Sequence, residues 1–276
     1  YSFKSWHQYV VFPFINVLSC IPWYFLSVQS SFLNDFYSHR VILLLLMCLF
    51  LPFFYDFLKK YFNQQVAFLS TLSLLTLPRF FGELMVNSKD IPLCLLFAMT
   101  VLTFYKWTQF KNDKYYYLGV LFLVFTVTTK FEGVFIPIIM LLWSFFFERE
   151  FLFNQIKNLK SLTRKIFVSV FIFLGFVFII SPPLHALDSN SLKFIFGTYE
   201  YWKFIGPHHV HSWNLYSFSQ FIAGTPTAYL VLFAIGIIQA VIQIIKRDKK
   251  SSFLGLLLIW FLFIMLRALF SKNELL

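Results

Sequence analysis

A short polar stretch between two apolar segments, residues 76–92, is the part of the chain best equipped for chemistry. It gathers five charged or amide side chains: Arg79, Glu83, Asn87, Lys89 and Asp90. Guanidinium and ammonium groups at a membrane edge are suited to holding the phosphate of a bound lipid substrate, although they could also contact lipid phosphates non-specifically. Asp90, two residues before Pro92, is expected to be the N-cap of the following helix.

A second polar stretch, residues 199–214, combines aromatic and histidine side chains. Its candidate residues are Glu200, Tyr201, Trp202, His208, His209 and His211. Three interpretations stay open. The histidines could bind a metal, but no carboxylate stands at a defined spacing from them. The aromatic rings could stack on a sugar while Glu200 or a histidine binds its hydroxyl groups. The rings could instead form an interfacial aromatic belt.

The composition indicates what kind of scaffold positions these residues. Of the 276 residues, 59% are hydrophobic and 13% are charged, whereas roughly 25% are charged in an ordinary soluble domain. These values exclude a soluble globular enzyme, a disordered chain and a disulfide scaffold. The apolar stretches are continuous rather than alternating, which argues against a β-barrel. We therefore expect an all-α polytopic transmembrane helical bundle.

The apolar runs predict about eight spanning segments plus interfacial helices. The segments are residues 38–56, 66–77, 91–107, 115–129, 131–147, 166–180, 227–245 and 253–270. The second and fourth are shorter than the roughly 20 residues that cross a bilayer. An earlier run, residues 9–28, is interrupted by Pro13 and Pro22 and is expected to be a kinked interfacial helix rather than a ninth span. We expect one transmembrane domain over residues 1–276: an external segment (1–37), six spans (38–180), an external loop (181–226) and two spans (227–276).

The net charge of +11 predicts topology rather than nucleic-acid binding. Most of the lysines and arginines fall in or beside the loops 57–65, 108–114, 148–165 and 246–252, which lie on one side of the alternating topology. That side is expected to be cytoplasmic. All six histidines fall on the other side, so we expect the chemistry there, although long loops also hold more polar residues in general.

Four sequence pieces resemble the bacterial members of glycosyltransferase family 39, which belong to the GT-C superfamily. The most specific is Pro-Arg-Phe-Phe-Gly at 78–82 followed by Asn-x-Lys-Asp-Ile-Pro at 87–92. The others are Asp35 to His39 before a long apolar run, Thr-Thr-Lys-Phe-Glu-Gly at 128–133, and Gly-Thr-Pro at 224–226. The resemblance covers roughly residues 30–245 in the right order. Relatives include the dolichyl-phosphate-mannose protein mannosyltransferases and the lipid A aminoarabinose transferase.

The resemblance implies a GT-C-like fold and an inverting transfer of sugar from a polyprenyl-phosphate donor. The acceptor would be a lipid, a glycan or a protein on the non-cytoplasmic face, and membrane lipids would surround the enzyme. A bacterial inner membrane with a periplasmic active site is the expected location. No cofactor is expected, and a divalent metal is possible but not indicated. A nucleotide sugar is a weaker donor candidate, because the sequence has no phosphate-cradling glycine loop.

The chemistry assigns roles to particular residues. A base must take the acceptor proton, and basic groups must stabilise the departing phosphate. Arg79, Lys89 and Lys130 are the candidate phosphate ligands, supported by His39, Asn87, Asp90 and Glu132. The family's acidic motif lies just after its first spanning helix, and this chain is expected to begin after that motif. The true base would then lie upstream of Tyr1, and Asp35 is the catalytic candidate within the sequence.

Two other classes compete with the glycosyltransferase. A transporter or lipid flippase would place charges within its spans, near the middle of the bilayer. The charges here cluster at loop edges on one face, which argues against transport. A non-catalytic membrane scaffold is the third possibility, since the acidic motif is not visible in the sequence.

Overall fold

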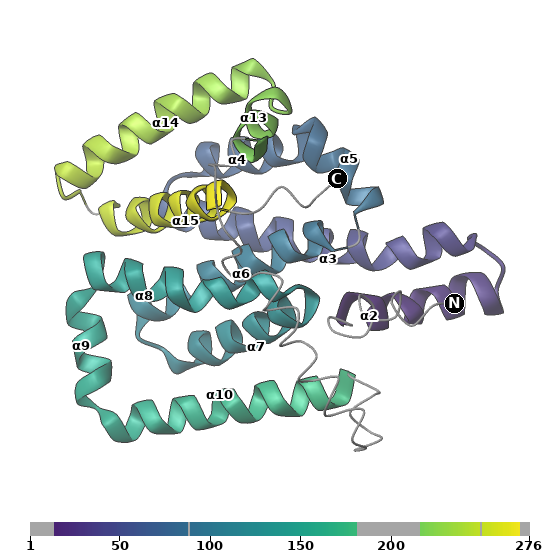
Figure 1. Cartoon of the computed structure of the whole chain (residues 1–276), viewed down its shortest axis with the longest axis horizontal. Coiled ribbons are helices and arrows are strands. Elements are labelled where there is room, and N and C mark those ends of the chain that lie inside the picture. The colour runs from purple at the N-terminus through teal and green to yellow at the C-terminus, as the bar shows by residue number, and fades with distance from the viewer. Residues whose placement is uncertain (1–13, 88, 181–215, 249, 271–276) are drawn as a thin grey trace. The chain divides into compact units, whose positions relative to one another are not determined.

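The computed structural model describes residues 14–87, 89–180, 216–248 and 250–270, and every regular element among them is a helix (Figure 1). The helices are α2 (Phe14–Trp23), a π-helix (Tyr24–Gln29), α3 (Asp35–Tyr61), α4 (Gln64–Thr76), α5 (Pro78–Val86), α6 (Asp90–Phe110), α7 (Asp113–Thr129), a 3₁₀-helix (Phe131–Val134), α8 (Phe135–Phe147), α9 (Arg149–Lys157), α10 (Leu159–Ile180), α13 (Tyr216–Ala223), α14 (Thr227–Ile245) and α15 (Ser251–Phe270).

The prediction of an all-α membrane protein is confirmed. Each predicted spanning segment is helical, although α10 begins seven residues before the predicted 166 and the segment 131–147 is divided between the 3₁₀-helix and α8. Four helices among the described residues are long and apolar enough to cross a bilayer: α3, α6, α10 and α14. Helices α4 and α8 have 13 residues each, fewer than the roughly 20 that a crossing needs, so the predicted number of about eight spans stays a prediction.

Asparagine side chains set the starts of several helices. The side-chain oxygens of Asn34, Asn63 and Asn112, directly before α3, α4 and α7, each accept a backbone N–H from the first turn. These N–H groups have no partner inside the helix, so such a cap stabilises the helix start, typically by about 1 kcal/mol.

The chain divides into two compact units. The first unit is Tyr1–Ile136 with Asn158–Lys193, and the second is Pro137–Lys157 with Phe194–Leu276. In the first unit, one apolar cluster joins α3, α5 and α6 through residues such as Phe50, Leu84 and Leu95. Another joins α2, α3, α6 and α10 through Phe14, Leu43, Leu96 and Ile180. Helix α6 contributes to both clusters and is the centre of this unit.

Helices α6 and α7 form a closely packed antiparallel pair. The hydroxyl groups of Thr100 and Thr126 lie 3.1 Å apart across the pair, and both residues are fully buried. Nearer the connecting loop, a Cβ added at Gly119 would lie 2.9 Å from the ring of Phe104. Small and hydroxylated residues at a helix interface allow this kind of close approach in membrane proteins.

The directions of the helices give the first unit two ends. Helix α3 runs parallel to α6, because Leu43 packs with Leu96 and the Phe57 ring lies 6.1 Å from that of Tyr105. The starts of α3 and α6 and the end of α7 therefore lie at one end. The ends of α3 and α6 and the starts of α4 and α7 lie at the other.

The N-terminal apolar run packs on the bundle. Helix α2 forms a hairpin with α3 (Figure 1), and its Phe14 ring stacks on Phe125 of α7 with 4.5 Å between ring centroids. Helix α2 and the π-helix together cover 16 residues, too few for a crossing by an untilted helix. The run begins outside the described residues, so the expectation of an interfacial helix rather than a ninth span stays a prediction.

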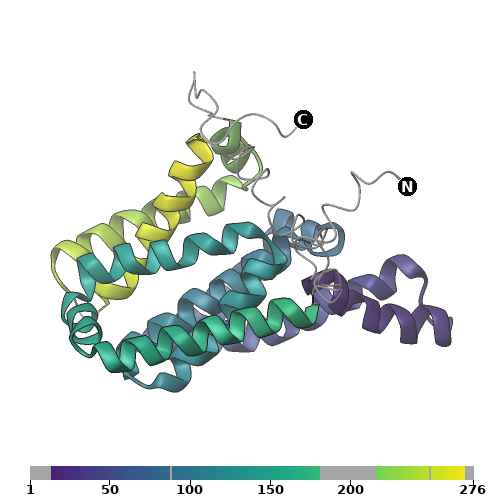
Figure 2. The same cartoon turned by 60° about the horizontal axis from the view of Figure 1, so that its bottom comes forward.

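In the second unit, α14 and α15 form a hairpin (Figure 2) that packs against α8. The fully buried indole of Trp143 donates to the backbone oxygen of Ser252 over 2.8 Å, and the hydroxyl of Ser252 donates to the carboxylate of Glu148 over 2.6 Å. A Cβ at Gly255 would overlap the ring of Phe147. A side chain at this position would therefore displace that ring.

A buried ion pair attaches α10 to the α6–α7 pair. The ammonium of Lys165, a residue only 4% exposed, lies 2.8 Å from the carboxylate of Asp113. It also lies 5.1 Å from the ring of Trp107 and 5.7 Å from that of Tyr116. Aromatic faces attract a cation, so two rings and one carboxylate together compensate this buried charge.

We predict an asymmetric response when this pair is broken. Asp113→Asn leaves a buried ammonium without its counter-charge and is expected to lower the free energy of unfolding by about 1–3 kcal/mol. Lys165→Met should cost less, because the carboxylate that remains is partly exposed and can be hydrated. Unfolding in mixed detergent measures both, with Lys114→Met as the control. Equal effects of the two changes would contradict this account.

Candidate functional site

The polar stretch at 76–92 folds as the short helix α5 followed by a capped turn into α6. Pro78 is the first residue of α5, where its missing N–H costs nothing, and the helix ends before Asn87. The amide oxygen of Asn87 then accepts the backbone N–H groups of Lys89, over 3.2 Å, and of Asp90, over 2.8 Å. The turn is therefore held by Asn87.

The prediction that Asp90 is the N-cap of α6 is wrong. Asp90 is the first residue of that helix, and Lys89 stands at the cap position without a capping side chain. Asn87 supplies the side-chain acceptor at this turn, and its Nδ2 also donates to the carboxylate of Asp90 over 2.8 Å. The Asp90 carboxylate therefore does not cap its own helix but accepts from Asn87 and from Lys130.

The turn after α7 presents Lys130 and Glu132. Lys130 has an extended backbone that ends the helix, and a 3₁₀-helix follows. The N–H of Gly133 donates to the carbonyl of Lys130 over 3.1 Å and closes the turn. A Cβ at Gly133 would lie 2.8 Å from the backbone nitrogen of Val127 and 2.9 Å from the backbone carbon of Thr126. Only glycine allows the turn to fold back so closely on α7.

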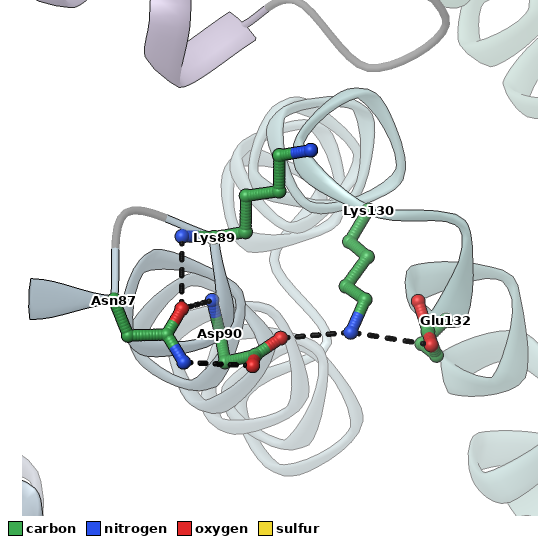
Figure 3. A network of polar contacts seen from close by, with 5 residues as sticks. All are labelled: Asn87, Lys89, Asp90, Lys130 and Glu132. Atoms are coloured by element: carbon green, nitrogen blue, oxygen red, sulfur yellow. Dashed lines mark hydrogen bonds and ion pairs between the residues drawn. The ribbon is translucent and has the colours of Figure 1, made fainter. Parts of the chain in front are cut away.

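These two turns meet in a polar network of five residues, Asn87, Lys89, Asp90, Lys130 and Glu132 (Figure 3). The Lys130 ammonium lies 2.7 Å from an oxygen of Asp90 and 3.5 Å from an oxygen of Glu132. Figure 3 shows this ammonium pointing between the two carboxylates, while the side chain of Lys89 points away from Asp90. The structure thus joins residues 40 positions apart in the sequence.

The network keeps Lys130 protonated. Partial burial of the side chain would lower the pKa of Lys130, but the charges of Glu132 and Asp90 and the hydrogen bonds to both carboxylates outweigh it and raise that pKa above its ordinary value. A raised pKa of Lys130 means that the ion pair stabilises the fold at neutral pH and loses this contribution only as the pH rises above about 10. The ammonium is therefore a permanent positive charge at physiological pH.

The remaining predicted residues of the first unit lie on neighbouring elements. Arg79 is exposed in the first turn of α5. Asp35 begins α3, and one of its carboxylate oxygens accepts from Trp23 Nε1 and from Ser27 Oγ. The ring of His39 stacks on that of Trp23, with 5.4 Å between centroids. Asp35 and His39 thus share a cluster with Trp23 and Ser27, which sequence reasoning did not single out.

The predicted sugar and acceptor residues, Glu200, Tyr201, Trp202, His208, His209 and His211, lie outside the described residues. Within the described part of the chain, no group of three or more His, Cys, Asp and Glu side chains is arranged to hold a metal ion. The metal interpretation of the histidines stays untested.

Comparison with known proteins identifies one family. A family model described as dolichyl-phosphate-mannose-protein mannosyltransferase matches residues 20–184, which is more than half of the chain. No curated protein and no solved structure matches the chain. The matched range includes α3 to α10 and all five residues of the network.

A glycine substitution tests whether the turn positions the network. Gly133→Ala is expected to push the turn off α7, to lower the free energy of unfolding by about 1–3 kcal/mol, and to separate Lys130 from Asp90. Gly82→Ala is the matched control, because a Cβ there meets nothing within 4 Å. Unfolding experiments on both variants would contradict the account if Gly133→Ala were as stable as Gly82→Ala.

Proposed function

The chain belongs to the dolichyl-phosphate-mannose-protein mannosyltransferase family, and from this premise we propose that it transfers a sugar from a polyprenyl-phosphate donor to a lipid, glycan or protein acceptor. The family is one of membrane glycosyltransferases of the GT-C type, as the sequence resemblance predicts. The proposed reaction is inverting and takes place at the non-cytoplasmic face, which in a bacterial cell is the periplasmic side of the inner membrane.

The contact of Lys130 with Asp90 and Glu132 carries the proposal. An ammonium has three N–H donors, and the two carboxylates engage it over 2.7 and 3.5 Å. We assign the third donor to an oxygen of the donor phosphate. A charge held in place before the reaction stabilises the negative charge that grows on the departing phosphate, without reorganising during the step. Asp90 and Glu132 are then positioning residues for Lys130.

Arg79 and Lys89 complete the proposed phosphate site. Lys89 belongs to the network (Figure 3) and stands directly before α6, and Arg79 lies in the first turn of α5. The two carboxylates together exceed the single positive charge of Lys130, so further positive charge is needed to bind a phosphate that leaves with an added negative charge. Arg79 can offer two parallel N–H groups to it, whereas Lys89 acts as a point charge.

Asp35 is the proposed base within the described residues. The hydrogen bonds from Trp23 and Ser27 go to the same carboxylate oxygen and fix the orientation of the group. The second oxygen is the one we assign to the acceptor hydroxyl proton. His39, stacked on Trp23, would support this cluster, and the 199–214 loop would hold the sugar or the acceptor.

The distribution of charge supports the proposed side of the membrane. The network lies at the end of the first unit formed by the starts of α3 and α6. Lys59, Lys60, Lys111 and Lys114 lie at the opposite end. Lysines concentrate on the cytoplasmic side of membrane proteins, so this polarity favours a network that faces away from the cytoplasm.

Turnover of a lipid-linked sugar in membranes tests the proposal. Lys130→Ala is expected to lower turnover by roughly 100-fold, the effect of removing one stabilising donor from a transition state. Lys89→Ala should also lower turnover. Lys114→Ala, which removes a lysine at the opposite end, is the control and should leave turnover unchanged.

Two results would contradict the proposal. Turnover that is unchanged in both Lys130→Ala and Lys89→Ala would overturn the phosphate assignment. Movement of the lipid-linked substrate across the bilayer without sugar transfer would favour a flippase instead. Asp90→Asn tests whether Asp90 positions Lys130 or only stabilises the fold. If Asp90 positions Lys130, the substitution should lower turnover while unfolding measurements show that the variant is still folded.

A further inference from the structure

Positive charge gathers at the end of the first unit opposite the network. Five lysines lie there, at the ends of α3 and α6 and the start of α7: Lys59, Lys60, Lys106, Lys111 and Lys114. None of them forms an ion pair within the described part of the chain. The carboxylate of Asp113 in the same region is engaged by Lys165 and, at 4.0 Å, by Arg164. Asp56, near the end of α3, offsets part of the charge of Lys106. This end of the unit therefore carries an excess of positive charge.

Aromatic rings hold two of these ammonium groups in place. The ammonium of Lys60 lies 3.9 Å from the ring of Phe110. That of Lys106 lies 4.7 Å from the ring of Phe53 and 5.4 Å from the ring of Phe57. Cation–π contacts of this length fix a lysine without neutralising its charge. The two lysines are thus ordered and still able to attract an anion.

An open apolar groove lies between α3 and α4. It has a volume of about 260 Å³ and is lined by Leu51, Pro52 and Tyr55 of α3 and by Phe68, Leu72 and Leu75 of α4. The hydroxyl of Thr71, which also lines it, donates to the carbonyl of Ala67 within its own helix. The groove is smaller than the roughly 300–1,000 Å³ of a site for a drug-sized ligand, and its apolar lining suits a single hydrocarbon chain.

The groove and the charge are continuous along α3. Lys59 follows Tyr55 by four residues, and residues four apart lie on the same helix face. The groove residues of α3 lie in the half of that helix nearer the lysines. An amphiphile with its chain in the groove would place its headgroup at Lys59, beside Lys60.

We propose that this end of the first unit binds an anionic phospholipid, with one acyl chain in the α3–α4 groove and the phosphate at Lys59 and Lys60. The apolar groove selects a lipid and the excess of lysines selects a negative headgroup, because basic clusters at a membrane surface attract anionic lipids. The site is separate from the proposed donor site, which lies at the other end of the same helices.

Lipid binding by the purified full chain tests the proposal. Native mass spectrometry and thermal unfolding would follow the binding of phosphatidylglycerol and of phosphatidylcholine. The unsubstituted chain should bind phosphatidylglycerol more tightly and be stabilised by it. The double variant Lys59→Gln with Lys60→Gln should bind it more weakly, by roughly fivefold for each lysine removed. Leu72→Trp, which fills the groove and keeps the lysines, should also lose binding.

Matched controls separate this site from general charge effects and from catalysis. Lys246→Gln with Arg247→Gln removes the same charge from the second unit and should leave binding unchanged, as should Lys130→Ala at the proposed donor site. Inorganic phosphate should give no stabilisation. The proposal is overturned if the Lys59 and Lys60 double variant binds phosphatidylglycerol like the unsubstituted chain, if phosphatidylcholine binds equally well, or if inorganic phosphate reproduces the stabilisation.

Discussion

The hydroxyl groups of Thr100 and Thr126 meet across α6 and α7, and this contact requires the two helix backbones to lie close together over most of their length. The ring of Phe104 fills the space over Gly119 for the same reason. With the register fixed by these contacts, the start of α6 must lie beside the end of α7. The meeting of Asp90 and Lys130 is a consequence of this packing and does not have to support the helix pair itself.

The sequence was sufficient to predict the apolar helices of the bundle, whereas α5, α9 and α13 fall in segments expected to be polar connections or loops. Apolar runs define the extents of these helices, because a helix in lipid needs an apolar surface, which is a local property of the sequence. The residues of the network could be predicted from the sequence, but the contacts between them could not. The contact of Lys130 with Asp90 depends on the register of α6 and α7, which a single sequence does not encode locally. The capping role expected of Asp90 was wrong because Asn87, three residues earlier, supplies the competing side-chain acceptor.

The first unit holds lysines in two different environments, at opposite ends of its long helices. At one end, Lys130 is enclosed by carboxylates in a turn that only Gly133 allows. At the other end, Lys60 and Lys106 rest on aromatic rings and form no ion pair within the described residues, although the charge of Asp56 acts on Lys106. Both arrangements fix an ammonium group in space, but only the first pairs it with carboxylates. Lysine therefore serves two purposes in this unit. Lys130 is held at a fixed position by its carboxylates, whereas Lys60 and Lys106 are arranged to attract an anion.

The buried contact of Lys165 also makes one packing contact depend on another. The groups that surround its ammonium, Trp107, Asp113 and Tyr116, all belong to the α6–α7 pair. The docking of α10 through Lys165 therefore depends on the packing of α6 against α7, so a change that separates that pair is also expected to expose this charge.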